Sequence, residues 1–301
     1  MLELEYNKND YYWKLLQRQV QEQRIEKIFG IFRENGFEPI LIKGWAAAGN
    51  YPKPFERLSV DIDVAVSAVN YLECQKLLKR QTIGEVDLHC ELRHLDTVAW
   101  DDLFEHSQLV KLNKTDVRIL CAEDHLRTLC VHWLTDGGVS KERLWDIVYA
   151  IKNRPKNFDW DRCLYTVSET RKDWIICTVG LAVRYLGLDI KNTPLNNLLR
   201  EIPEWMIKTV EKEWESKIGL KPLQNCLSDG KEFFEQIKKR IPPNPIQATI
   251  EMEGKFDAKT RIFYQVGSVL FRFKPSIKRI SKTLWRTRVN KNQKTVSYEK
   301  E

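Results

Sequence analysis

The sequence predicts an α+β fold, in which a small mixed β-sheet with flanking helices forms a head and an all-helical region follows it. Short segments in which polar and apolar residues alternate, as in half-buried strands, lie before residue 121. After that residue the apolar side chains recur at helical spacing. We therefore expect a sheet-containing head at residues 1–121, a helical region at residues 122–270 and a basic tail at residues 271–301.

The first expected element is an amphipathic helix at residues 12–32, which Asn35-Gly36 would end and which we expect to pack on the sheet. A short apolar strand at residues 39–42 follows and is closed by Lys43 and Gly44. A helix at residues 45–48 would then expose backbone N–H groups at its start, where phosphate binds well. Lys43 adds a positive charge beside them.

The central element is the strand at residues 59–66, along which side chains alternate between the two faces. One face carries four apolar side chains, and the other carries Asp61 and Asp63. Two carboxylates this close repel each other unless a cation lies between them, and Mg²⁺ commonly fills that role. The pattern therefore indicates a metal site. The alternative is a strand whose acidic face is simply solvated.

Two features flank this strand. Arg57 precedes it, after a proline-containing loop, and could contact either phosphate or a carboxylate in a salt bridge. After a short helix at residues 70–79 and a turn at Gly84, a second alternating strand at residues 86–90 places Asp87 and His89 on one face. Asp87 thus supplies a third carboxylate, while His89 is either an accessory active-site residue or a structural one.

The later elements are assigned from the same periodicities. We expect a helical turn at residues 100–106, a further strand at residues 117–120, and a helix that begins at a Ser140 cap. The other expected helices lie at residues 122–134, 160–167, 174–186, 204–218 and 231–240.

Taken together, these motifs resemble the polymerase-beta-type nucleotidyltransferase superfamily. Within it they are similar to an uncharacterised bacterial nucleotidyltransferase group with a Leu-Lys-Gly signature. The resemblance covers roughly residues 35–185 and is carried by Leu41-Ile42-Lys43-Gly44, Arg57, Asp61-Ile62-Asp63, Asp87-Leu88-His89, His132 and Asp146.

This resemblance implies that Asp61 and Asp63 hold two Mg²⁺ (or Mn²⁺) ions and that Asp87 completes the metal site and helps to activate the acceptor. It also implies that Lys43, Gly44 and Arg57 bind the triphosphate, and that the helical region completes the substrate cleft. The chain departs from the superfamily pattern in two places. Lys43-Gly44 replaces the usual Gly-Ser, and only about two dozen residues separate Asp63 from Asp87, so the acceptor pocket is expected to be open.

Other chemistries lack their sequence markers. All five histidines lie between His89 and His132, but no Cys-x₂-Cys pair accompanies them, so structural zinc is not expected. The seven cysteines, without regular spacing, indicate reduced thiols. No nucleophile-elbow, P-loop or dinucleotide-binding glycine motif occurs.

Charge and hydropathy limit the possible partners. The final segment, residues 271–301, has ten Lys/Arg and two Glu, so the other residues contribute about −1 to the net charge of +7. The head is therefore not a general nucleic-acid binder, whereas the basic tail is suited to an acidic partner or a membrane surface. No run of about eighteen apolar residues and no signal-peptide profile occurs, so we expect a cytoplasmic protein without a transmembrane segment.

The expected function is metal-dependent transfer of NMP from an NTP to an unidentified acceptor hydroxyl or phosphate, with release of pyrophosphate. The acceptor could be a small molecule, a peptide, a protein or an RNA end. One alternative is kinase-like transfer of the γ-phosphoryl group from the same site. Another is an inactive nucleotide-binding or antitoxin-like partner protein.

Overall fold

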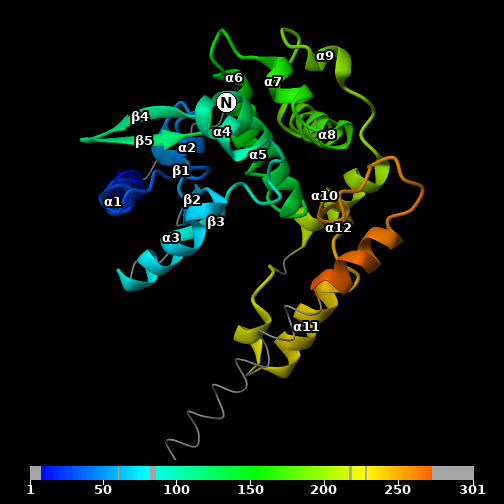
Figure 1. Ribbon diagram of the computed structural model, residues 1–301. Coiled ribbons are helices and arrows are strands. Elements are labelled where there is room, and N and C mark those ends of the chain that lie inside the picture. Colours follow the sequence, from blue (N-terminus) through cyan, green and yellow to red (C-terminus); the bar gives the residue numbers. More distant parts are fainter. Residues whose placement is uncertain (1–7, 60, 82–85, 217–218, 228, 273–301) are drawn as a thin grey trace, which may run out of the picture. The chain divides into compact units, whose positions relative to one another are not determined.

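The computed structural model describes residues 8–59, 61–81, 86–216, 219–227 and 229–272. The fold is mixed α+β, with a five-stranded mixed sheet and many helices (Figure 1). Contacts divide the chain into a first unit, Met1–Trp133 with Ser140–Glu201, and a second unit, Leu134–Val139 with Ile202–Glu301. The boundary predicted at residue 121 falls within the first of these units. Within the described residues, no helix has the length and apolar character needed to cross a membrane.

The sheet belongs to the first unit and has the strand order β3-β2-β1-β5-β4. Its strands are β1 (Ile40–Leu41), β2 (Ile62–Val66), β3 (Val86–Cys90), β4 (Gln108–Leu112) and β5 (Thr115–Ile119). β2 pairs parallel with β3 and antiparallel with β1, while β1 pairs parallel with β5. The sequence analysis missed β4, which forms a hairpin with β5 through a turn in which Asn113 has φ 47°.

One face of the sheet is covered by α1 (Lys8–Glu34) and α3 (Ala68–Arg80). Ile62, Val64 and Val66 of β2 all lie in this core, as the alternating pattern predicts. Only the C-terminal half of α1 contributes buried side chains to it, such as Ile25 and Phe32. The predicted packing of this helix on the sheet thus holds for its C-terminal half, whereas Trp13 near its start is 58% exposed.

The opposite face carries a second, smaller core. It joins Ile40, Ala65 and Leu120 to Leu103 of α4 (Trp100–His106). Strand β2 is therefore buried on both faces, and an ionisable side chain on it needs partners within the protein. Two short elements precede β2, namely α2 (Trp45–Ala48) and the 3₁₀ turn η1 (Pro54–Glu56).

After β5 the described elements are helices. Those that lie mainly in the first unit are α5 (Ala122–Thr135), α6 (Leu144–Lys152), α7 (Trp160–Tyr165), α8 (Glu169–Leu186) and α9 (Leu195–Leu198). The predicted Ser140 cap was wrong: α6 begins at Leu144, and the Ser140 hydroxyl instead donates to Glu142. Ser168 caps α8, and Gly187 ends that helix with φ 64°.

The second unit contains α10 (Glu204–Glu215), the 3₁₀ turn η2 (Leu223–Cys226), α11 (Gly230–Arg240), α12 (Pro245–Glu251) and a helix at residues 262–272. Four predicted features lie wholly or partly outside the described residues. These are Val60 of the acidic strand, the turn at Gly84, the last two residues of the helix expected at residues 204–218, and all but the first two residues of the basic tail.

Candidate metal centre

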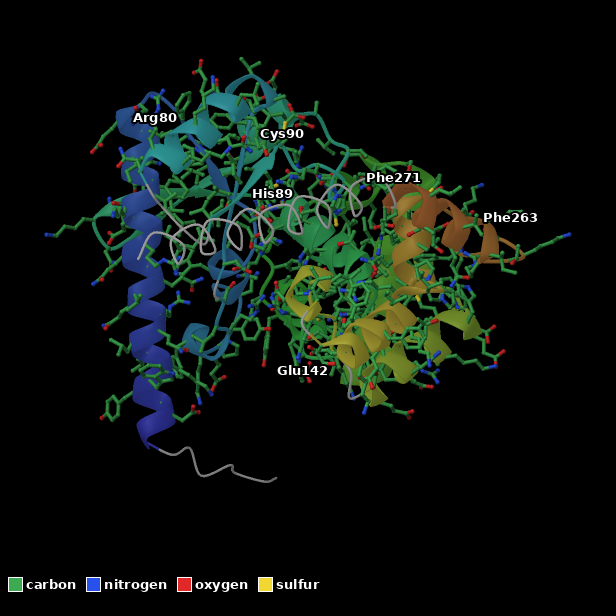
Figure 2. The ribbon with its side chains drawn as sticks, turned by 90° about the horizontal axis from the view of Figure 1, so that it is seen from below. Arg80, His89, Cys90, Glu142, Phe263 and Phe271 are labelled. Atoms are coloured by element: carbon green, nitrogen blue, oxygen red, sulfur yellow. The ribbon has the colours of Figure 1, made fainter. Side chains whose placement is uncertain are left out.

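The pairing of two strands brings the candidate site together. In the parallel β2–β3 register, Asp63 lies opposite Asp87 and Ala65 lies opposite His89. Because the side chains of a strand alternate between faces, Asp63, Asp87 and His89 project from the same face of the sheet. The small side chain of Ala65 leaves room for the imidazole opposite it. Figure 2 labels His89 among the side chains of the sheet.

These three residues form a compact cluster of possible metal ligands. One ligand atom from each lies within 4.8 Å of the other two. His89 Nε2 is 3.1 Å from Asp87 Oδ2 and 3.4 Å from Asp63 Oδ1. Asp63 and His89 are buried, whereas the Asp87 side chain is 51% exposed. Two of the three possible ligands, Asp63 and His89, are thus buried, and the carboxylate of Asp87 is accessible to solvent.

Lys43 provides the positive charge that the buried carboxylate requires. Its Nζ lies 2.9 Å from Asp63 Oδ1 and 3.1 Å from His132 Nε2. Lys43 follows β1 and His132 lies on α5, so the tertiary fold joins three distant segments at this point. His132, one of the residues that carry the resemblance, thus lies in contact with Lys43.

The surroundings favour the ionised form of both carboxylates. Burial alone would raise the pKa of Asp63, but His89 and Lys43 outweigh burial and lower it. The contact with His89 is the main cause that lowers the pKa of Asp87, to about 2. Burial disfavours the charged imidazole of His89, yet Asp63 and Asp87 together raise its pKa.

The imidazole of His89 approaches both carboxylates through one of its ring nitrogens, Nε2. Among the described residues neither ring nitrogen makes a hydrogen bond of ordinary geometry, although Nε2 lies in ion-pair contact with both carboxylates. A buried nitrogen beside two carboxylates fits a divalent cation. The mixed oxygen and nitrogen donors suit Mn²⁺ better than Mg²⁺, which prefers oxygen ligands alone.

Asp61 stands apart from this cluster. It precedes β2, its side chain is exposed, and it is not one of the three clustered ligands. The alternative of a solvated acidic residue therefore describes Asp61 in this structure. Asp63, by contrast, is buried and faces cationic partners. The geometry pairs Asp63 with Asp87 on the neighbouring strand, rather than with Asp61 on its own strand.

Gly44 is constrained by its backbone. It has φ 62°, and a Cβ at this position would lie 3.0 Å from Ser59 Oγ. The positive φ favours glycine between Lys43 and α2, and any larger side chain would also have to displace Ser59. However, α2 has only four residues, so its dipole offers less to a phosphate than a long helix would.

Arg57 is held by a partner that lies far away in the sequence. Its Nε and Nη2 donate to the two carboxylate oxygens of Asp146, at 2.7 and 2.8 Å, and Tyr51 OH donates to the same carboxylate at 2.6 Å. Arg57 and Asp146 are both buried. The salt-bridge alternative for Arg57 thus describes this geometry, although the partner is neither Asp61 nor Asp63. Nothing in the sequence singled out Tyr51.

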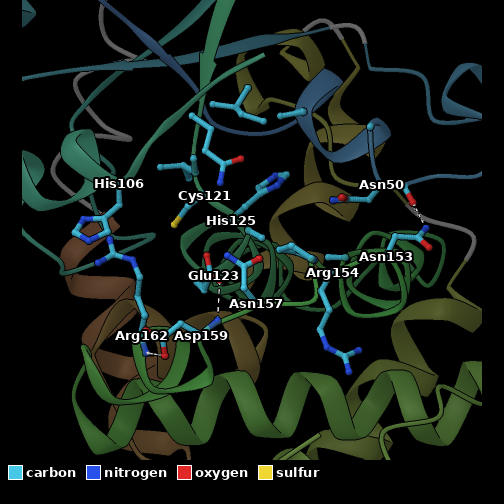
Figure 3. Close-up of a pocket in the computed structure, with 18 of the residues that line it drawn as sticks. Asn50, His106, Cys121, Glu123, His125, Asn153, Arg154, Asn157, Asp159 and Arg162 are labelled. Carbon is cyan, nitrogen blue, oxygen red and sulfur yellow. Dashed lines mark hydrogen bonds between the residues drawn. The ribbon is translucent and has the colours of Figure 1, made fainter. Parts of the chain in front are cut away.

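A cavity of about 950 Å³ lies elsewhere in the first unit, and none of the clustered ligands lines it. Its walls come mainly from β4, β5 and the helices α5 to α7 (Figure 3). Several of its charged groups are paired within the protein. Glu123 accepts from the backbone N–H of Asp159, and Arg162 contacts Asp102 and Asp124. The cluster of Asp63, Asp87 and His89 and this cavity are therefore separate features of the first unit.

Comparison with known proteins gives no match: no family model, no curated protein and no solved structure is significantly similar to the chain.

Proposed function

We propose that the protein is a metal-dependent nucleotidyltransferase, which transfers NMP from an NTP to an acceptor hydroxyl or phosphate and releases pyrophosphate. The observation that carries the proposal is the cluster of Asp63, Asp87 and His89 with Lys43 beside it. Clustered acidic ligands next to a lysine suit the binding of a divalent cation together with a polyphosphate. The sequence resemblance points to the same reaction.

Each residue has a distinct role in this proposal. Asp63, Asp87 and His89 would hold the cation, which when bound would neutralise charge on the phosphates and polarise the reacting oxygens. Lys43 neutralises charge on the triphosphate, and Gly44 lets the backbone approach it closely. The bond between the acceptor oxygen and the α-phosphorus forms as the bond to the pyrophosphate breaks. Asp87, the exposed carboxylate, accepts the proton of an acceptor hydroxyl.

In this scheme Arg57 acts indirectly. Its bidentate pair with Asp146 ties the segment before β2 to α6 and so positions the strand that carries Asp63. Catalysis would depend mainly on positioning and electrostatic stabilisation, because the site holds no activated nucleophile of its own among the residues that form it.

Mass spectrometry can test this proposal. The protein is incubated with each NTP and Mn²⁺ or Mg²⁺, alone and with cell extract, and products are searched for added NMP or added phosphate. We expect an NMP adduct and pyrophosphate with the native chain, and neither with Asp63→Asn. Asp116→Asn, which changes an exposed carboxylate on β5, is the matched control and should remain active.

The other outcomes identify the alternatives. An added phosphate with release of NDP would show kinase-like transfer. A stoichiometric, metal-dependent nucleotide complex without turnover would show a binding protein. Failure to bind any NTP in the presence of either metal would remove the basis of the proposal.

A further inference from the structure

The helix at residues 262–272, in the second unit, exposes a broad apolar surface. Phe263 is 78% exposed and Phe271 is 72% exposed. At about 100° per residue, the exposed apolar side chains cover roughly half of the helix circumference. We call this surface the apolar stripe; it consists of Ile262, Phe263, Val266, Leu270 and Phe271. Figure 2 labels Phe263 and Phe271.

The polar side of the same helix is attached to the rest of the second unit. Ser268 is fully buried and donates to Glu251 at 2.6 Å, and Arg272 Nε donates to the same carboxylate at 2.8 Å. Gln265 donates to the backbone carbonyl of Pro243 at 2.7 Å. An ordinary surface helix buries its apolar side and exposes its polar side. This helix does the reverse, so its apolar stripe is available to a partner.

The sequence that follows the stripe limits the kind of partner. Residues 273–301, whose structure is not described, contain nine Lys/Arg and two Glu, with Ile277, Ile280, Leu284 and Trp285 among the charges. A second copy of the chain would bring two cationic segments together. A nucleic acid would offer phosphates to the cations but little to the exposed phenylalanines. An anionic lipid surface satisfies both, since its headgroups attract the cations and its acyl boundary accepts the apolar side chains.

We infer that the helix at residues 262–272 docks the protein on an anionic membrane surface, and that the positive charge of the sequence after it adds electrostatic attraction. The apolar stripe enters the boundary between headgroups and acyl chains. This inference is independent of the proposed reaction.

Vesicle co-sedimentation tests the inference with the full chain. The probes are phosphatidylcholine vesicles with and without phosphatidylglycerol, at low and high salt. We expect binding only to the anionic vesicles, and weaker binding at high salt. Replacing two stripe residues, Phe263→Ser with Phe271→Ser, should lower the affinity at least about tenfold. Reversing two charges, Lys278→Glu with Arg279→Glu, should also weaken binding and should reduce its dependence on salt.

The matched control removes exposed apolar side chains from another helix. Val69→Ser with Leu72→Ser changes α3, where both side chains are exposed, and should bind as the native chain does. Circular dichroism checks that each variant is folded. A measurement without substitutions is hydrogen exchange of the native chain, in which anionic vesicles should protect residues 262–272.

Three results would overturn the inference. The first is equal binding to neutral and anionic vesicles, or no binding to either. The second is vesicle binding that the stripe substitutions leave unchanged, which would assign binding to the charges alone. The third is stripe-dependent dimerisation without lipid, which would make the occupant a second copy of the chain.

Discussion

Asp63 and Asp87 lie opposite each other on parallel strands, and both carboxylates contact the imidazole nitrogen Nε2 of His89. One buried carboxylate, one exposed carboxylate and an imidazole thus converge where two strands run side by side. Lys43 contacts the buried member from a third segment. Substitutions of Asp63, Asp87 or His89 should therefore affect metal binding, whereas a substitution of Lys43 should affect nucleotide binding.

The first prediction separates His89 from Asp61 as metal ligands. His89→Ala should lower Mn²⁺ affinity at least about tenfold, because it removes a ligand from the cluster. Asp61→Asn should have a smaller effect, since Asp61 is exposed and outside the cluster. Calorimetry measures both, with His94→Ala at an exposed position as the control. A larger loss of Mn²⁺ affinity for Asp61→Asn than for His89→Ala would instead support Asp61 and Asp63 as the metal ligands.

The second prediction concerns Lys43, which should bind phosphate rather than metal. Lys43→Ala should weaken NTP binding by about 1.5–3 kcal/mol, and NMP binding by less, since a charge-assisted contact with the outer phosphates is lost. Mn²⁺ affinity should be unchanged or higher, because the ammonium no longer competes for Asp63. Titrations of NTP, NMP and Mn²⁺ test this, with the exposed Lys53→Ala as control. Equal losses for the two nucleotides would assign Lys43 a structural role.

The third prediction is that Arg57 stabilises the fold. Arg57→Ala should lower the free energy of unfolding by about 3–5 kcal/mol, because it leaves the carboxylate of Asp146 buried without its cation. Arg143 is exposed and lies 4.0 Å from the same carboxylate, so Arg143→Ala should change stability by at most about 0.5 kcal/mol. Urea unfolding of both variants makes the comparison. A stable Arg57→Ala protein that has lost NTP affinity would instead favour the phosphate role.

The fourth prediction is a loss of stability in mild acid that arises from His125. Burial lowers the pKa of this histidine to about 4, and its Nε2 has no hydrogen-bond partner among the described residues. Between about pH 6.5 and about pH 4, this histidine is therefore protonated in the unfolded chain and neutral in the folded chain. Stability should fall by about 3 kcal/mol as the pH decreases from about 6.5 to about 4.

Replacing the titrating group tests this linkage. His125→Gln should flatten the pH dependence of the unfolding free energy over that range, whereas His94→Gln at an exposed position should leave it unchanged. Denaturant unfolding at a series of pH values gives both curves. An unaltered slope in His125→Gln would show that other groups cause the loss.

Local sequence patterns were sufficient for most of the strands and helices. The period of two in β2 correctly placed Ile62 and Val64 in the core and Asp63 on the other face, because strand geometry alone determines that alternation. Residues 86–90 were identified as a strand with the bounds that the structure shows. The short strand β4 was missed because most of its side chains, including the apolar Leu109, are exposed. Its sequence therefore lacks a regular alternation of buried apolar and exposed polar residues.

The sequence by itself determined which residues share one face of each strand or helix. Side chains alternate between faces along a strand and recur every three to four residues along a helix, so this depends only on neighbouring residues. Only the tertiary structure decided how they combine: Asp63 with Asp87 and His89, Lys43 with His132, and Arg57 with Asp146. The last pair lies 89 residues apart in the chain. Such partners are selected by packing, since a buried charge must find an opposite charge within the folded protein wherever the chain brings one.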